Sequence, residues 1–142
     1  MGFQWLEMRI AEEQDRRNKQ AQILGGLPRV VDELYHSLQE CVRSYRQAFG
    51  EEAADIRMQG SQIDVDVQEF SDGTWQPASH IAISTAPSLL ALQVDRGGEP
   101  LLIELGVLPG SKISYRHGDQ YLSLEELTRR ILDRAFFPKL SE

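Results

Sequence analysis

The sequence is poor in the features that define several large classes of protein. It has a single cysteine, Cys41, so no disulfide can form within the chain, and a reducing compartment is expected. No apolar run approaches the roughly 20 residues needed to cross a bilayer. Residues 1–17 carry acids and arginines where a secretory signal needs an apolar core. We therefore expect a cytoplasmic protein that does not enter a membrane.

The chain also lacks the short motifs that would specify a reaction or a cofactor. It has neither a glycine-rich phosphate loop nor the Gly-x-Ser-x-Gly turn of serine hydrolases. The three histidines, His36, His80 and His117, are not spaced as zinc ligands with one another or with Cys41. Cys41 falls within an apolar helical stripe, where it is expected to be a small buried side chain. No catalytic residue, cofactor-binding residue or cofactor is assigned.

The charge of the chain is concentrated in one short segment. The net charge is −7, and residues 51–72 hold seven acids against one base, which accounts for −6 of it. Such a surface repels phosphate backbones, so nucleic-acid binding is not expected. The simplest interpretation is a solvated face that keeps the protein in solution.

Length and composition are those of one ordinary domain. The chain has 142 residues, of which 41% are hydrophobic and 26% are charged. These values are typical of a globular protein and unlike those of a disordered one. We expect a single domain over residues 1–142, since domains most often contain about 100–150 residues.

Two helices are predicted in the first third of the chain. Acid-before-base pairs four residues apart favour a helix over residues 3–24, which Gly25 and Gly26 are expected to end. The middle of this helix is polar all round and therefore cannot be buried. Pro28 suits the first turn of a second helix, over residues 28–49, which carries a continuous apolar stripe.

The remainder of the chain is predicted to form an antiparallel sheet and a final helix. From Asp55 onward, apolar residues recur with a period of about 2, which indicates about five or six strands. Their connections, such as the glycine-rich turn at residues 96–100, are too short for parallel crossovers. Ser123 and Glu126 form a capping box that opens a helix ended by Pro138. The predicted fold class is α+β, with the C-terminal helix and the second helix packed on one face of a meander sheet.

Two aspartates are the only candidates for a metal site. Asp64 and Asp66 are two residues apart on one predicted strand, so both side chains leave the same face. Convergent carboxylates can bind a hard divalent cation. They can equally form the wet side of an edge strand, where charge discourages aggregation. No EF-hand spacing surrounds them, so no metal is assigned.

Large apolar side chains crowd the N-terminal end of the first predicted helix. They are Phe3, Trp5, Leu6, Met8 and Ile10. Chain termini fray unless they are tied down, so these side chains need either the protein's own sheet or a second copy. Aromatic residues are enriched at interfaces, and two-fold dimers are the commonest assemblies. We therefore predict that residues 1–24 project from the domain or serve in oligomerisation, and that the protein is a homodimer.

These patterns leave three functions open. The first is a non-enzymatic protein–protein interaction or adaptor module. The second is a small-ligand-binding or metal-binding domain, or an enzyme, with a pocket between sheet and helices that uses Asp64, Asp66, His80 and His117. The third is an acidic, chaperone-like binder of an extended partner segment. Size and acidity resemble those of bacterial secretion chaperones, but their helices alternate with strands, so no family is assigned.

Overall fold

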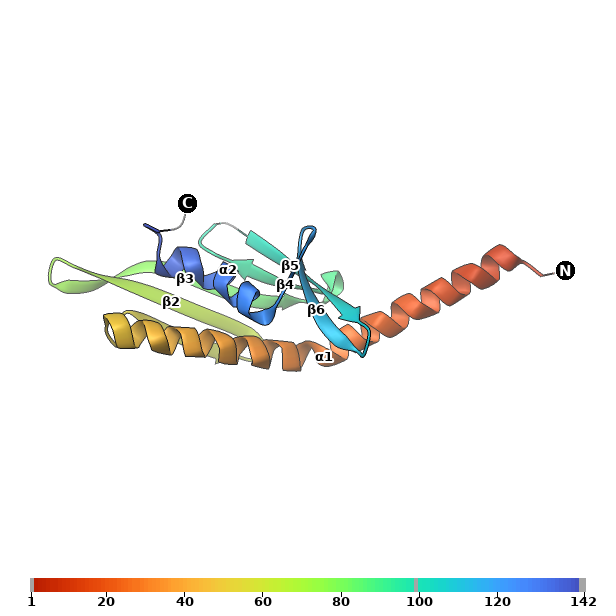
Figure 1. Cartoon of the computed structure of the whole chain (residues 1–142), viewed down its shortest axis with the longest axis horizontal. Coiled ribbons are helices and arrows are strands. Elements are labelled where there is room, and N and C mark those ends of the chain that lie inside the picture. Colours follow the sequence, from red (N-terminus) through yellow and green to blue (C-terminus); the bar gives the residue numbers. More distant parts are fainter. Residues whose placement is uncertain (1, 99, 141–142) are drawn as a thin grey trace.

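The computed structural model, which describes residues 2–98 and 100–140, is an α+β fold with one seven-stranded antiparallel sheet (Figure 1). The strands lie in the sheet in chain order, β1 to β7, which confirms the predicted meander. The strands are β1 (Ala54–Gln59), β2 (Gln62–Ser71), β3 (Thr74–Ala86), β4 (Ala91–Asp95), β5 (Pro100–Leu108), β6 (Lys112–His117) and β7 (Gln120–Leu122). Two helices accompany them, α1 (Gln4–Phe49) and α2 (Leu124–Phe136), together with a 3-10 turn at Pro87–Leu89.

The prediction of two N-terminal helices was wrong, because α1 is one continuous helix of 46 residues. Gly25 and Gly26 were expected to end a helix in the left-handed conformation, but neither has a positive φ. Gly26 instead lies against β6, where an added Cβ would sit 3.5 Å from Cγ1 of Ile113. That distance is an ordinary van der Waals contact, so the space beside the sheet would also accept an alanine, and the helix continues through this glycine.

Pro28 also lies inside α1 rather than at the start of a second helix. Proline removes one backbone hydrogen bond and crowds the carbonyl four residues earlier, at a cost of about 3 kcal/mol. Ile23 and Val30, on either side of it, are both buried at 3% exposure. Burial on both sides of Pro28 keeps the chain helical through the proline, so packing overrides the local signal, and the helix bends where the arm leaves the sheet (Figure 1).

The sheet has one strand more than the predicted five or six. The short β7 was missed, since its three residues, between the turn at residues 118–119 and the helix cap at Ser123, are too few to show a strand period. β3 contains Pro77, which cannot donate a hydrogen bond to a neighbouring strand. The pairing of β2 with β3 shifts register between Val67 and Gln68, beside this proline, as at a β-bulge. The predicted turn between β4 and β5 has positive φ at Gly97 and Gly98, and Glu99 lies outside the described residues.

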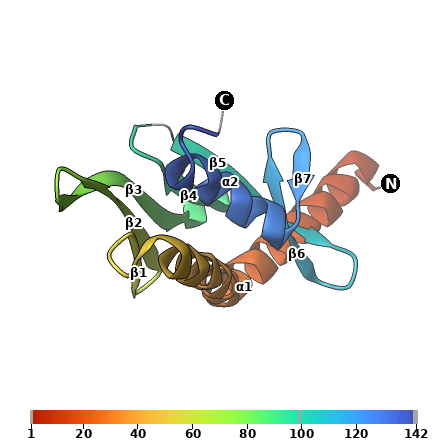
Figure 2. The same cartoon turned by 60° about the vertical axis from the view of Figure 1, so that its left-hand side comes forward.

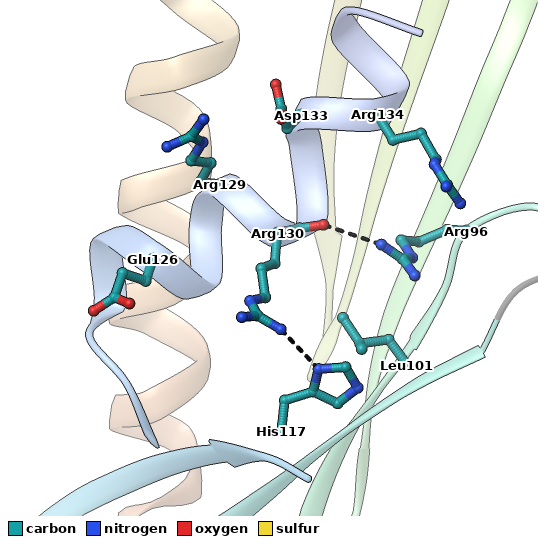
Figure 3. Close-up of a pocket in the computed structure, with 8 residues that line it drawn as sticks. All are labelled: Arg96, Leu101, His117, Glu126, Arg129, Arg130, Asp133 and Arg134. Carbon is teal, nitrogen blue, oxygen red and sulfur yellow. Dashed lines mark hydrogen bonds between the residues drawn. The ribbon is translucent and has the colours of Figure 1, made fainter. Parts of the chain in front are cut away.

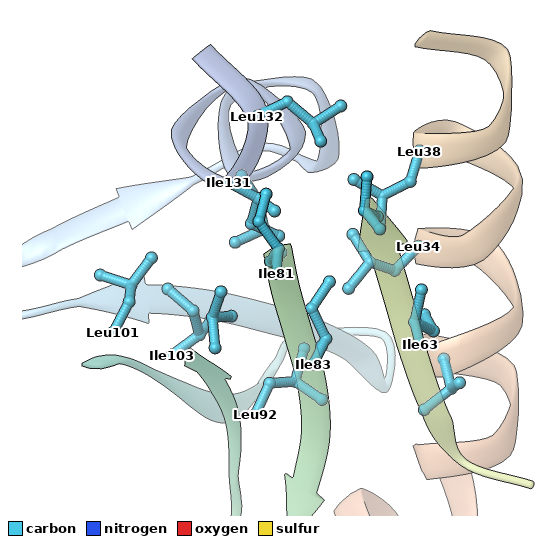
Figure 4. Close-up of a cluster of buried hydrophobic side chains, with 14 of the residues drawn as sticks. Leu34, Leu38, Ile63, Ile81, Ile83, Leu92, Leu101, Ile103, Ile131 and Leu132 are labelled. Carbon is cyan, nitrogen blue, oxygen red and sulfur yellow. The ribbon is translucent and has the colours of Figure 1, made fainter. Parts of the chain in front are cut away.

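Both helices cover the same face of the sheet, as predicted (Figures 1 and 2). Leu34 and Leu38 of α1 point toward the strands beside Ile131 of α2, and all three are fully buried (Figure 4). Ile63 and Ile83 contribute from β2 and β3, where they are direct cross-strand neighbours. The core is therefore a two-layer structure, and it leaves the opposite face of the sheet uncovered by helices.

The capping box predicted for the C-terminal helix is confirmed. The Ser123 hydroxyl accepts a hydrogen bond from the Glu126 amide at 3.1 Å, and the Glu126 carboxylate accepts one from the Ser123 amide at 3.2 Å. Once started there, α2 places Thr128 2.8 Å from the Ser37 hydroxyl of α1. This buried polar contact fixes how the two helices lie against each other.

Candidate functional site

The N-terminal end of α1 extends beyond the sheet and forms an arm, defined here as residues 3–22 (Figures 1 and 2). Its polar middle is helical and solvated, and ion pairs along the helix support it. Arg16 donates to Glu13 at 2.8 Å, and Lys19 lies 3.0 Å from Asp15. Such pairs contribute about 0.2–0.5 kcal/mol each, and the arm also grows from a helix that packing has already formed.

The five predicted interface residues all lie on this arm and are all exposed. Their exposures are Phe3 67%, Trp5 66%, Leu6 42%, Met8 65% and Ile10 48%. No strand of the described sheet lies beneath this end of the helix (Figure 1). The chain's own sheet, one of the two surfaces expected to bury these residues, therefore does not do so.

An apolar groove lies where the arm joins the domain, and we call it the foot groove. It has a volume of about 490 Å³. Its α1 wall is formed by Leu24, Leu27, Pro28 and Val31, with the carboxylate-bearing Asp32 beside them. The opposite wall comes from the sheet and its turns, and consists of Met58, Gly60, Ser61 and Thr85. Leu24 and Met58 are 38% and 39% exposed, so the groove presents apolar side chains to solvent.

A second cleft, of about 500 Å³, lies between α2 and the neighbouring strands and is rich in arginine (Figure 3). Arg130 reaches from α2 to the ring of His117, with 3.0 Å between its Nη1 and the His117 Nδ1, and also contacts Gln120. Arg96 donates to the Arg130 carbonyl at 3.2 Å. The cleft is completed by Leu101, Glu126, Arg129, Asp133 and Arg134. The four arginines outnumber the two carboxylates, Glu126 and Asp133, so the lining carries a net positive charge that favours an anionic ligand.

Asp64 and Asp66 project from the face of the sheet that no helix covers, and the structure brings His80 between them. The ring nitrogens of His80 lie 3.4 Å from an Asp64 oxygen and 2.7 Å from an Asp66 oxygen. Arg57 donates to the other oxygen of Asp66 at 2.9 Å. β2 lies between β1 and β3, so the interpretation of these aspartates as the wet side of an edge strand was wrong. The cross-strand ion pair with Arg57 and the contacts with the His80 ring explain how they are tolerated there.

The four residues proposed for an enzyme or a ligand site do not form one constellation. Asp64, Asp66 and His80 are together, but His117 lies in the arginine-rich cleft. Within the described part of the chain, no group of three or more histidine, cysteine, aspartate or glutamate residues is arranged to hold a metal ion. His36 is elsewhere again, on the exposed side of α1 beside Asp32.

A third hollow joins the C-terminal ends of both helices to the β2–β3 hairpin. Tyr45 and Phe136 stack with 4.2 Å between ring centroids, and Phe70 meets Trp75 edge to face at 5.4 Å. Burial raises the pKa of the Tyr45 hydroxyl, and the charge of Glu69 adds to this effect. These rings pack largely on one another. Their outer edges leave apolar surface at the solvent, and Phe70 is 60% exposed.

Cys41 is exposed, so the prediction that it is a buried hydrophobe was wrong. Val42, the next residue, takes the core position at 2% exposure. Neighbouring side chains nevertheless shield the thiol partly from solvent, and this desolvation raises its pKa. The negative charges of Glu40 and Glu125 add to the increase. A thiol with a raised pKa is a poor nucleophile at neutral pH.

No helix in the described ranges is long and apolar enough to cross a membrane. The chain matches no protein-family model, and no curated protein or solved structure proved similar to it. The surfaces described above therefore carry the whole functional argument.

Proposed function

We propose that this protein is a non-enzymatic interaction module that self-associates through the arm of α1. The observation that carries the proposal is the position of five exposed apolar side chains at the end of a helix that extends beyond its own domain. An ordinary monomer exposes apolar residues singly, whereas a cluster that contains Phe and Trp is characteristic of an interface. A rigid helical support also lowers the entropic cost of binding.

Light scattering of the full chain over a range of concentrations tests this proposal. We expect a dimer at about 100 μM, which Leu6→Asp converts to a monomer because a buried carboxylate would be unpaired at the interface. The matched control is Leu89→Asp, at another leucine that is exposed to 61% but lies on the 3-10 turn and not on α1. A wild-type chain that remains monomeric at this concentration would contradict the proposal.

The second candidate function is binding of a small anion in the arginine-rich cleft, and the four arginines support it. A ligand that binds only the folded state raises the melting temperature through mass action. Melting in phosphate, compared with chloride at equal ionic strength, should show an increase that Arg129→Ala reduces. Equal melting temperatures in the two salts would remove this candidate.

A further inference from the structure

The apolar residues of the arm form a stripe that continues into the foot groove. A helix turns by about 100° per residue, so Phe3, Leu6, Ile10 and Leu24 fall within an arc of about 60°. Pro28 and Val31, which line the foot groove, lie at the same side of the helix by the same geometry. The positions along this stripe, at alternating steps of three and four residues, are Phe3, Leu6, Ile10, Glu13, Arg17, Gln20, Leu24 and Leu27.

This spacing is the heptad pattern of a helix that packs against another helix. Glu13, Arg17 and Gln20 interrupt it, and they occupy the centre of the stripe. Trp5 and Met8 lie outside the arc, with Met8 on the opposite side of the helix. The stripe is therefore apolar at both ends and charged in the middle.

We propose that a second copy of this chain packs on the stripe in the antiparallel direction, with the two-fold axis at the level of Asp15. This inference rests on the proposed function and specifies the partner and its register. In this arrangement Leu6 faces the partner's Leu24, and Phe3 faces the partner's Leu27 at the edge of the partner's foot groove. The apolar ends of each stripe are thus covered by the other copy.

Charge complementarity selects this direction. Antiparallel packing places Glu13 against the partner's Arg17, and symmetry repeats the contact. Parallel packing in register would place Glu13 on Glu13 and Arg17 on Arg17, which is unfavourable twice over. Polar residues at the core of a helical pair commonly fix register in this way, at some cost in stability.

Arg17 can move from Glu13 of its own helix to a partner without breaking the hydrogen bonds between Glu13 and Arg16. Glu13 accepts two hydrogen bonds from Arg16, at 2.8 and 2.9 Å, while Arg17 is only 3.6 Å from it and its side chain is 73% exposed. Arg17 is therefore available to the partner's Glu13. The foot groove, at about 490 Å³, has room for an aromatic side chain such as the partner's Phe3.

Cysteine pairs provide the decisive test, in a Cys41→Ser background. One batch of the full chain carries Leu6→Cys, another carries Leu24→Cys, and the two are mixed and oxidised. The antiparallel register brings the two thiols of a mixed dimer together, and holds two copies of Cys at position 6 about 27 Å apart. That distance greatly exceeds the reach of a disulfide, about 7 Å between Cα atoms. We therefore expect crosslinked mixed dimers and no crosslinking within either batch alone.

The possible results separate this inference from the proposed function. Crosslinking within each batch would show a parallel dimer, and would overturn the register while leaving self-association in place. A dimer that crosslinks in neither experiment would also overturn the register. A chain that stays monomeric by light scattering would overturn both.

A matched pair of substitutions tests the face of the helix independently. Ile10→Asp places a charge on the stripe and should weaken dimerisation by at least about 100-fold, because both copies lose apolar burial. Gln22→Asp introduces the same charge at an exposed position well outside the arc of the stripe, and should change the dissociation constant by less than about threefold. Equal weakening by both variants would contradict the assigned stripe.

Discussion

The two halves of α1 both carry large apolar side chains, but these have different surroundings. Residues 23–49 lie on the sheet, where Leu34 and Leu38 are completely buried. In the arm, residues 3–22, the large apolar side chains lie between Phe3 and Ile10 and face solvent. An apolar stripe is half of an interface, and the fold supplies the other half only where the sheet lies beneath the helix. The covered half is therefore complete within the fold, whereas the exposed apolar side chains of the arm favour the proposal that a partner covers them.

The two halves also differ in what keeps them helical. Isolated helices of this length are marginal in water, because nucleation is costly. The covered half is stabilised by packing, and the arm grows from it with ion pairs such as Lys19–Asp15 as local support. A change in the covered half should therefore alter global stability, and a change in the arm should alter association.

The largest effect is expected from truncating equivalent leucines in the two halves. Leu38→Ala should lower the free energy of unfolding by about 2–5 kcal/mol, because it leaves a cavity between α1, α2 and the sheet. Leu6→Ala, measured at a concentration where the chain is monomeric, should change it by less than about 0.5 kcal/mol. Urea denaturation followed by circular dichroism measures both. Comparable losses in the two variants would mean that the arm packs on its own domain.

A smaller effect, a gain in the free energy of unfolding, is expected from a substitution where the two halves of α1 meet. Pro28→Ala restores a backbone hydrogen bond within α1 and removes the crowding by the proline ring, so unfolding should require about 1–3 kcal/mol more. The gain is limited, because proline also restricts the unfolded chain. Thermal melting of the monomer provides the measurement. A lower melting temperature would show that the junction depends on the proline.

The glycines at the same junction should respond less. Gly25→Ala points into open space and should stabilise the helix by about 0.5–1 kcal/mol, since alanine is the better helix former. Gly26→Ala adds a methyl group in ordinary van der Waals contact with Ile113, so its gain should be at least as large. If Gly26→Ala clearly lowers the stability while Gly25→Ala raises it, the reason for a glycine at position 26 is its close approach to β6.

This junction also shows what could be predicted from the sequence and what could not. The period change near Asp55 and the capping box at Ser123 are local signals, and the structure agrees with both. Gly25, Gly26 and Pro28 are also local signals, and they were misleading because burial of Ile23 and Val30 outweighs them. Local chemistry decides an element where no packing competes with it.

The candidate sites divide in the same way. Crowding of apolar residues at the N-terminal end of α1 could be read from the sequence, since it needs no knowledge of contacts. The arginine-rich cleft could not, because Arg96 and His117 come from segments that meet α2 only in the fold. Arg129, Arg130 and Arg134 on one short helix were the available signal. The bridge from His80 to both aspartates likewise depends on the register of β2 and β3.

The smallest expected effect compares thiols on the two halves of α1. Burial raises the pKa of Cys41, with Glu40 and Glu125 adding to the increase, so less thiolate is present at a given pH than for an unperturbed cysteine. The rate of alkylation by iodoacetamide rises with pH as the thiol loses its proton, and for Cys41 the midpoint of this rise should lie at a higher pH than for a thiol in the arm. The arm thiol is introduced as Gln22→Cys in a chain that also carries Cys41→Ser. Glu125→Gln should move the Cys41 midpoint part of the way back, because it removes a negative charge contributed by α2. A Cys41 midpoint at or below that of the arm thiol would mean that water reaches this side of the covered half as freely as it reaches the arm.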